Sequence, residues 1–220
     1  MNPGIFGGMR SDLVASLRLV AVTDDAVLAG RELVDACAAA ASGGATMIQL
    51  RLKHAPPREL ADLCRSLLAR LTVPVIVNDR IDVALAAGAH GVHLGADDIE
   101  PARARTVVPP GFIIGASVGV AAEIDRGHAA DYWGIGPWRI TSTKADAGTA
   151  LGPAGFAELQ RRASGRPCVA IGAVRAEDVR AIFAGGASGV AVVSGIFGVP
   201  EVEAAARGYA EAIRESGGTS

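Results

Sequence analysis

The chain alternates between short apolar runs and longer amphipathic stretches. The apolar runs are rich in Val and Ile, which is typical of strands buried on both faces. Eight such runs occur, at residues 17–23, 46–50, 73–78, 91–94, 112–117, 132–136, 167–172 and 189–194. The stretches between them, such as 31–42 and 57–71, repeat apolar residues at helical spacing. The pattern therefore predicts strands that alternate with helices.

A weak internal repeat supports this alternation. Segments 42–50, 86–94, 127–135 and 184–192 each place a small residue at a helix end and then start a strand. Strands separated by helices form a parallel sheet through right-handed crossovers. Eight such units in 220 residues match the lower size range of a (β/α)8 barrel. We therefore expect an α/β protein, a single-domain TIM barrel over residues 1–220, with frayed ends at about 1–12 and 215–220.

Composition narrows the class of partner. Half of the residues are hydrophobic, a fifth are charged and the formal net charge is -2, so neither a nucleic-acid nor a membrane partner has electrostatic support. No segment reads as a signal peptide or a bilayer span, which predicts a cytoplasmic protein that binds small polar ligands. The cysteines are three, widely spaced and without a CxxC pair, so we expect buried free thiols at Cys37, Cys64 and Cys168.

Active sites of such barrels lie at the carboxyl ends of the strands. The second predicted strand ends in QLRLK, where alternation points Gln49, Arg51 and Lys53 to one side and Leu50 and Leu52 to the other. Two cations and an amide favour anion binding, since Arg offers a planar fork to phosphate oxygens and Lys a point charge. A salt-bridged rim, or a charge cluster at the start of a helix, is the alternative.

Carboxylates follow the next two predicted strands. Asn78 and Asp79 end the third strand, and either Asp97 or Asp98 follows the fourth. Carboxylates beside phosphate-binding cations suit Mg²⁺, which proteins hold with one or two carboxylates plus waters and substrate phosphate oxygens. Helix N-capping by Asp97 or Asp98 is the alternative. His93 reads as a packing residue, because no second His or Cys stands at metal spacing.

The later strand ends are rich in small residues. Ser117 ends the fifth strand, and the loops after the seventh and eighth strands contain Gly172, Ala173, Ser194 and Gly195. Barrels of this kind commonly bind a phosphate there through backbone N–H groups. Packing alone is the alternative reason for the glycines.

The segment after the sixth strand, ITSTK, is neither helical nor strand-like in pattern. Its hydroxyls at Thr141, Ser142 and Thr143 stand next to Lys144, between the two predicted anion sites. We expect this loop to bridge two phosphorylated ligands, with the hydroxyls on one and Lys144 on the other.

These motifs together resemble a known family. QLRLK, VNDRIDVALAAGAHGVHLGADD, IIGAS, DYWGIGP followed by TSTK, AIGAV and GVAVVSGI occur in the order found in the thiamine phosphate synthase family, over nearly the whole chain after Arg18. The resemblance implies a transferase that joins a pyrimidine diphosphate to a thiazole phosphate, giving thiamine phosphate and pyrophosphate. It also implies a dissociative reaction, in which pyrophosphate leaves first and the thiazole nitrogen captures the pyrimidine cation.

The resemblance also implies the role of each site residue. The pyrimidine and its diphosphate would be held by Gln49, Arg51, Lys53, Asn78, Ser117 and Lys144, of which Arg51, Lys53 and Lys144 would act catalytically on the leaving group. Asp79 and Asp98 would carry Mg²⁺, the implied cofactor. The thiazole phosphate would be held by Thr141, Thr143, Gly172, Ala173, Val193 and Ser194.

The chain departs from the family pattern at a few positions. Ala173 replaces the second glycine of a pair, Ala96 a glutamine and Ile140 a proline, and the pair Trp138 and Arg139 is unusual. Two other functions stay open: a thiazole tautomerase-like isomerase of the sister branch, and a non-catalytic paralogue that binds thiamine phosphates. The sequence does not decide whether the thiazole must be carboxylated, and it leaves a homodimer open as the assembly.

Overall fold

The computed structural model of the chain describes residues 13–28, 32–140 and 148–217. The predicted frayed ends fall mostly outside this part, because 1–12 and 218–220 are not described. Within it, Glu215 is the last residue of the final helix. The extent of the domain over residues 1–220 stays a prediction.

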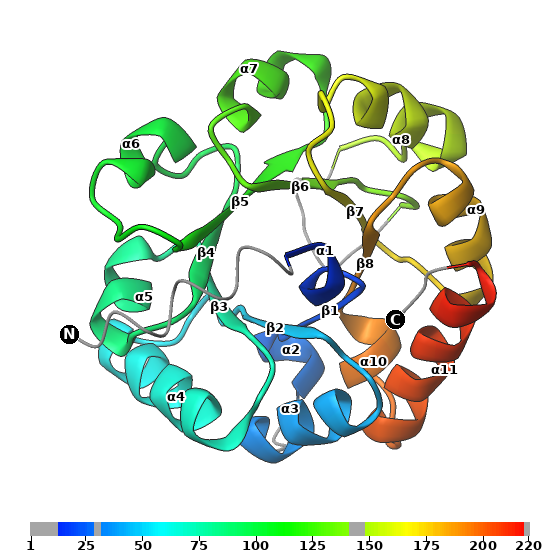
Figure 1. Cartoon of the computed structure of the whole chain (residues 1–220). Helices are drawn as coiled ribbons and strands as arrows, with labels where there is room; N and C mark the ends of the chain where they lie inside the picture. The colour runs from blue at the N-terminus through cyan, green and yellow to red at the C-terminus, as the bar shows by residue number, and fades with distance from the viewer. Residues whose placement is uncertain (1–12, 29–31, 141–147, 218–220) are drawn as a thin grey trace.

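Eight parallel strands close into a barrel in sequence order, with β8 paired to β1 (Figure 1). Each predicted apolar run contains one strand, so the predicted TIM barrel is confirmed. The strands are β1 (Leu19–Val22), β2 (Met47–Leu50), β3 (Val75–Asn78), β4 (Gly91–Leu94), β5 (Ile113–Val118), β6 (Tyr132–Ile135), β7 (Cys168–Ile171) and β8 (Gly189–Val192).

Helices connect the strands and surround the barrel, except for α1, which precedes β1. They are α1 (Leu13–Ser16), α2 (Asp25–Leu28), α3 (Leu33–Ser42), α4 (Pro57–Arg70), α5 (Ile81–Ala87), α6 (Pro101–Arg105), η2 (Ala121–Glu123), α7 (Ile124–Gly127), α8 (Gly152–Arg161), η3 (Ala176–Asp178), α9 (Val179–Ala184), α10 (Ser194–Phe197) and α11 (Val202–Glu215). The last helix, α11, packs against α3, so the end of the chain meets its beginning and completes the outer ring.

Helix α4 shows how the sequence pattern sets this ring. Proline at its first position loses no helical hydrogen bond there, because a first-turn N–H has no intrahelical acceptor. Leu60, Cys64 and Leu67 recur at intervals of four and three residues and are buried against the barrel. Burial of each such leucine contributes roughly 1.5–3 kcal/mol. The predicted helices at 31–42 and 57–71 thus correspond to α3 and α4.

The core has two layers because successive side chains of a strand point to opposite faces. Leu19 and Ala21 of β1 face the helices, whereas Val20 and Val22 face the barrel interior. The interior layer also contains Met47, Ile76, Ile113, Tyr132, Val169 and Ala191. At one end Leu13 and Leu17 pack onto this layer, and α1 lies across the centre of the strand ring in Figure 1. The barrel interior is therefore filled at the end where Leu13 and Leu17 lie. The cavity described below lies at the opposite end.

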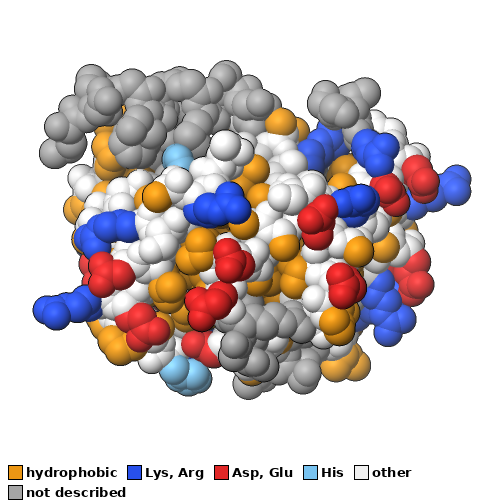
Figure 2. All heavy atoms as spheres, turned by 90° about the horizontal axis from the view of Figure 1, so that it is seen from below, with side chains coloured by type: hydrophobic (Ala, Val, Ile, Leu, Met, Phe, Trp, Pro, Cys, Tyr) orange, Lys and Arg blue, Asp and Glu red, His pale blue; other side chains and the backbone are white. Residues whose placement is uncertain are grey.

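The outer surface is mixed in charge. On the face seen in Figure 2, acidic and basic side chains are interspersed and neither sign forms a single block. Among the described helices, none has the length and apolar character needed to cross a membrane.

The three cysteines are buried free thiols, as predicted. Burial raises the pKa of Cys37 and Cys168 to about 12 and that of Cys64 to about 11. Since the thiolate is the reactive form, we expect the native protein to resist iodoacetamide at pH 8. Mass spectrometry should find alkylation at all three positions only after unfolding in urea. Rapid labelling of the native protein at any of them would contradict this burial.

Candidate active site

A cavity of about 520 Å³ opens at the carboxyl ends of the strands. Every described residue among the predicted site residues lines it: Gln49, Arg51, Lys53, Asn78, Asp79, Asp98, Ser117, Gly172, Ala173, Val193 and Ser194. The remaining three, Thr141, Thr143 and Lys144, lie outside the described residues. Reading the strand ends therefore located the cavity, although it did not establish what each residue does there.

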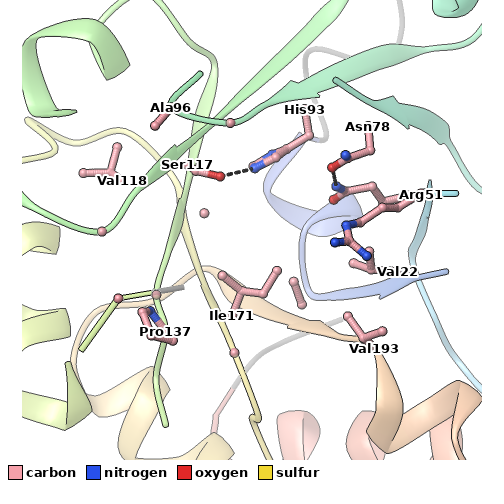
Figure 3. Close-up of a pocket in the computed structure, with 18 of the residues that line it drawn as sticks. Val22, Arg51, Asn78, His93, Ala96, Ser117, Val118, Pro137, Ile171 and Val193 are labelled. Carbon is pink, nitrogen blue, oxygen red and sulfur yellow. Dashed lines mark hydrogen bonds between the residues drawn. The ribbon is translucent and has the colours of Figure 1, made fainter. Parts of the chain in front are cut away.

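The QLRLK strand end is arranged as alternation predicted. Leu50 is buried between barrel and helices, whereas Gln49, Arg51 and Lys53 border the cavity. The Gln49 side-chain N–H donates to Asn78 Oδ1 at 2.7 Å, so these two amides hold one another in place beside Arg51 (Figure 3). The Arg51 residue is nearly buried, with 9% of its surface exposed.

Arg51 has a carboxylate partner that the sequence reasoning missed. Its Nη1 donates to Asp24 Oδ2 in an ion pair, and Asp24 is itself only 7% exposed. The neighbouring Thr23 accepts the Arg51 N–H at 2.8 Å and donates to the Arg51 carbonyl at 3.1 Å. Asp25 accepts the Lys53 N–H at 2.6 Å. The turn after β1 therefore holds the backbone of both cationic residues and one guanidinium group.

This arrangement combines the two interpretations that the sequence left open. Arg51 is salt-bridged, yet it also lines the cavity, so Asp24 offsets part of its charge and fixes its direction. A hydrogen-bonded guanidinium is oriented before any anion arrives. The signal for Asp24 was present in the TDD that directly follows the first strand, at the same end of the barrel as the other carboxylates.

Asp79 and Asp98 meet beside Gly95. A Cβ atom at Gly95 would lie 3.2 Å from Asp98 Oδ2 and 4.0 Å from Asp79 Oδ1, so both carboxylates border the same small space. Asp79 has a φ of 61°, a left-handed conformation that costs a non-glycine residue roughly 1 kcal/mol or more. Its N–H donates to the His93 carbonyl at 2.8 Å. The strained turn is thus tied to the neighbouring strand, β4.

The N-capping alternative for Asp97 and Asp98 is wrong. Helix α6 begins only at Pro101, and its N-cap residue, Glu100, makes no side-chain cap. Asp98 instead accepts the Gly95 N–H at 2.6 Å and closes the turn after β4. The two predicted metal ligands are therefore adjacent in space, as a shared ion would require.

Two carboxylates suit Mg²⁺ better than a metal that needs a full set of protein ligands. Within the described ranges, no three acidic, histidine or cysteine side chains form a metal-binding group. Mg²⁺ usually keeps several waters and completes its shell with substrate phosphate oxygens. The donor set at Asp79 and Asp98 fits that mode of binding.

The turn after β7 has consecutive left-handed residues, Gly172 with φ of 98° and Ala173 with φ of 49°. A Cβ at Gly172 would lie 2.7 Å from Cα and Cβ of Pro137, so this glycine is needed for packing whatever else it does. Ala173 is exposed and borders the cavity. Its backbone, rather than its methyl group, is the feature that suits an anion.

The unusual pair Trp138 and Arg139 fastens the β6 end to this turn. The Trp138 N–H donates to the Ile171 carbonyl at 2.8 Å, and the Arg139 N–H to the Gly172 carbonyl at 3.0 Å. The Arg139 guanidinium also pairs with Asp178. Burial acts to raise the pKa of the Asp178 carboxyl, but hydrogen bonds led by that from Arg139 outweigh it and hold the pKa below its usual value. The Trp138 side chain is buried and packs edge-on against Phe156, so both residues have a structural reason to be there.

His93 is buried, as expected of a packing residue, but it also reaches the cavity. Its Nδ1 lies 2.9 Å from the Tyr132 hydroxyl. Its Nε2 lies 3.1 Å from Ser117 Oγ, a contact that Figure 3 shows. No sequence pattern indicates this link, because it joins three strands whose residues are far apart along the chain.

Comparison with known proteins agrees with this geometry. The family described as thiamine monophosphate synthase matches residues 19–196. A thiamine-phosphate synthase of Azorhizobium caulinodans is 45% identical over 196 residues, covering 87% of this chain and 92% of that protein. One of Methanoculleus marisnigri is 46% identical over 200 residues, covering 89% and 94%.

Solved structures show the same likeness. The thiamine phosphate pyrophosphorylase from Pyrococcus furiosus superposes with a TM-score of 0.82 at 32% identity, covering 93% of this chain and 98% of that one. A 3-hexulose-6-phosphate synthase superposes with a TM-score of 0.62 at 16% identity, which shows a shared fold and nothing further.

The Asp24–Arg51 pair generates a prediction about stability. Asp24→Asn leaves a nearly buried guanidinium without its counter-charge, so the free energy of unfolding should fall by roughly 2 kcal/mol or more. The control is Asp62→Asn, which breaks a solvent-exposed pair with Arg65 and should cost less than about 1 kcal/mol. Urea unfolding of both variants measures the difference. Equal losses would show that the buried pair contributes no more than a surface one.

Proposed function

The chain belongs to the thiamine monophosphate synthase family, and from this premise we propose how its cavity acts on its substrates. The activity is that of a thiamine-phosphate synthase, a transferase. We propose that the cavity holds a pyrimidine diphosphate and a thiazole phosphate together, and releases thiamine phosphate and pyrophosphate. The observation that carries the proposal is the convergence of Arg51, Lys53 and two carboxylates on one side of a cavity whose other side has a backbone turn of small residues.

The pyrimidine diphosphate belongs on the side of β2 to β5. Arg51 and Lys53 there offer positive charge, and the paired amides of Gln49 and Asn78 offer hydrogen bonds to a planar ring. Lys144, which lies outside the described residues, would be a further cation, as the resemblance to the family implies. These groups would stabilise the charge that develops on pyrophosphate as it leaves. The Arg51 guanidinium is already oriented by Asp24, so it would do this without reorganisation.

Asp79 and Asp98 would hold Mg²⁺ against the diphosphate. When bound there, the ion would neutralise charge on the leaving group and act as a template for its oxygens. The protein contributes the position of the two carboxylates, one fixed by a left-handed backbone and the other by its bond to the Gly95 N–H.

The thiazole phosphate belongs on the side of β7 and β8. Gly172 and Ala173 form a turn of two successive left-handed residues, and Val193 and Ser194 stand at the start of the short helix α10. First-turn N–H groups of a helix have no acceptor within it, and small residues let an anion approach the backbone. The hydroxyls of Thr141 and Thr143, which lie outside the described residues, would bind this phosphate as well, as the resemblance to the family implies.

Apolar side chains between these two sides favour a dissociative reaction. Val22, Ile171 and Val193 line the cavity between the polar groups (Figure 3). A pyrimidine cation formed by departure of pyrophosphate is exposed to capture by water, and apolar walls reduce that competition. The thiazole nitrogen then attacks without help from a protein base, so the site needs charge stabilisation and exclusion of water rather than a general base.

The proposal includes a cytoplasmic location, because both substrates carry phosphate charges that are costly to move through a bilayer. It does not depend on whether the chain works alone or as a homodimer.

Pyrophosphate release tests the function and its metal together. With both substrates and Mg²⁺ the protein should release pyrophosphate, and omission of either substrate or addition of EDTA should abolish turnover. Asp98→Asn should lower kcat by roughly two or three orders of magnitude, the scale for loss of one preorganised electrostatic group, while Asp97→Asn changes it little. Asp79→Ala should likewise reduce kcat strongly while changing the free energy of unfolding little. Full turnover in EDTA would refute the metal assignment.

A second test concerns the departure at Ala173. Ala173→Gly removes the steric cost of a left-handed alanine, which is roughly 1–2 kcal/mol. It also raises the conformational entropy of the unfolded chain, which lowers stability by about 0.4–1 kcal/mol. Stability should therefore stay equal or rise, and calorimetry should find thiazole phosphate bound equally or more tightly. The control is Ala204→Gly in helix α11, which should cost about 1 kcal/mol. Weaker thiazole phosphate binding by Ala173→Gly would contradict phosphate binding at this turn.

A further inference from the structure

Three polar side chains on neighbouring strands form one hydrogen-bonded chain. Tyr132 of β6 contacts His93 of β4, and His93 contacts Ser117 of β5. The backbone makes room for this contact at Gly115, which pairs with His93 on one side and Tyr132 on the other. A Cβ there would lie 2.3 Å from Tyr132 Cζ and 2.5 Å from His93 Nδ1. The histidine ring and the phenol can meet only because this strand position has no side chain.

The direction of the first bond follows from burial. Tyr132 is 1% exposed, and its surroundings inside the barrel are apolar side chains such as Ile76, Ile113 and Val169. A buried hydroxyl proton that lacks an acceptor is strongly disfavoured. Burial also raises the pKa of Tyr132, so the phenol keeps its proton. Within the described part of the chain, the acceptor in reach is His93 Nδ1, at 2.9 Å, and Tyr132 therefore donates to it.

The direction of the second bond follows from the first. A neutral imidazole that accepts at Nδ1 has its proton on Nε2. That N–H points at Ser117 Oγ, 3.1 Å away, so the serine oxygen accepts from the histidine. A hydroxyl that accepts on one side still has its own proton to donate. Ser117 is half-buried and lines the cavity, and Figure 3 shows its side chain beside that of His93.

We propose that Tyr132, acting through His93, makes Ser117 a hydrogen-bond donor to an acceptor atom of the bound pyrimidine diphosphate. This inference rests on the proposed function and deepens it. Ser117 selects a diphosphate oxygen or an unprotonated ring nitrogen and disfavours an amino group at the same place. Tyr132 is a positioning residue, because it does not line the cavity and acts on the substrate through His93 and Ser117.

Removal of the phenolic hydroxyl should weaken the order of the chain. In Tyr132→Phe the Nδ1 atom loses the donor that keeps the histidine proton on Nε2, so the preference for that tautomer falls and Nε2 accepts from Ser117 in part of the molecules. In those molecules the serine proton points at the histidine rather than at the substrate. A lost hydrogen bond to a charged or polar acceptor corresponds to roughly tenfold weaker binding or more.

A double-mutant cycle tests the coupling. The dissociation constant of pyrimidine diphosphate is measured for the wild type, Tyr132→Phe, Ser117→Ala and the double variant. Ser117→Ala should weaken binding by roughly tenfold. Tyr132→Phe should weaken it by a smaller factor, and the double variant should be no weaker than Ser117→Ala. Additive losses would overturn the proposal. Tyr209→Phe is the matched control, because it removes another buried phenol, one that donates to the Val174 carbonyl at 2.9 Å. An equal loss in this control would also overturn it.

Two ligand arms distinguish the acceptor atom. Calorimetry compares inorganic pyrophosphate in the presence of Mg²⁺ with the unphosphorylated pyrimidine alcohol. A loss of pyrophosphate affinity in Tyr132→Phe assigns Ser117 to the diphosphate, and a loss for the alcohol assigns it to the ring. Unchanged affinity for both would refute the donor role.

A measurement without substrate separates this inference from the proposed function. In protein with ¹⁵N-labelled histidine, the ring nitrogen shifts report which nitrogen carries the proton, and a His93→Gln variant identifies the signal. We expect the Nε2–H form in the wild type and gain of the Nδ1–H form in Tyr132→Phe. An Nδ1–H histidine in the wild type would refute the inference even if the enzyme proves fully active as a synthase.

Discussion

Closure of the eight-stranded barrel is the constraint on which the site depends. Parallel strands in sequence order bring all their carboxyl ends to one rim, so residues separated by more than a hundred positions become neighbours. The same closure forces alternate side chains inward, where Met47, Ile76 and Tyr132 fill the lower part. Nearer the rim stand small residues such as Gly134 and Ala191, and the space that they leave is part of the cavity. Packing of the barrel thus creates the site as well as the stability.

Two of the charged side chains at the rim, Arg51 and Asp98, are held by hydrogen-bonded partners. A buried guanidinium without a partner would be costly, so Arg51 is held by Asp24, and Asp98 is held by a backbone N–H. Each partnership leaves a charged group oriented toward the cavity before a ligand enters. That preorganisation suits a reaction whose difficulty is the departure of a multiply charged group.

The sequence predicted the strands and the rim residues well, because both follow from short-range patterns. Apolar runs located β1 to β8, and period-two alternation placed Gln49 and Arg51 at the cavity. It missed contacts between strands. Nothing within a single strand indicates that Asp24 meets Arg51, or that Gly115 lets Tyr132 reach His93, because these contacts depend on the register of neighbouring strands. The capping alternative for Asp98 failed for a related reason: the turn closes before helix α6 begins.

The position of Tyr132 couples stability to recognition. A phenol in the centre of an apolar barrel must satisfy its hydroxyl, and the histidine that does so also lines the cavity. With Nδ1 accepting from the phenol, His93 donates from Nε2 to Ser117 at the cavity wall. A phenylalanine at this position would fill nearly the same volume but would not fix which partner donates in the bond between His93 and Ser117. The polar group in the core therefore makes sense as part of the binding site, which a purely apolar interior could not supply.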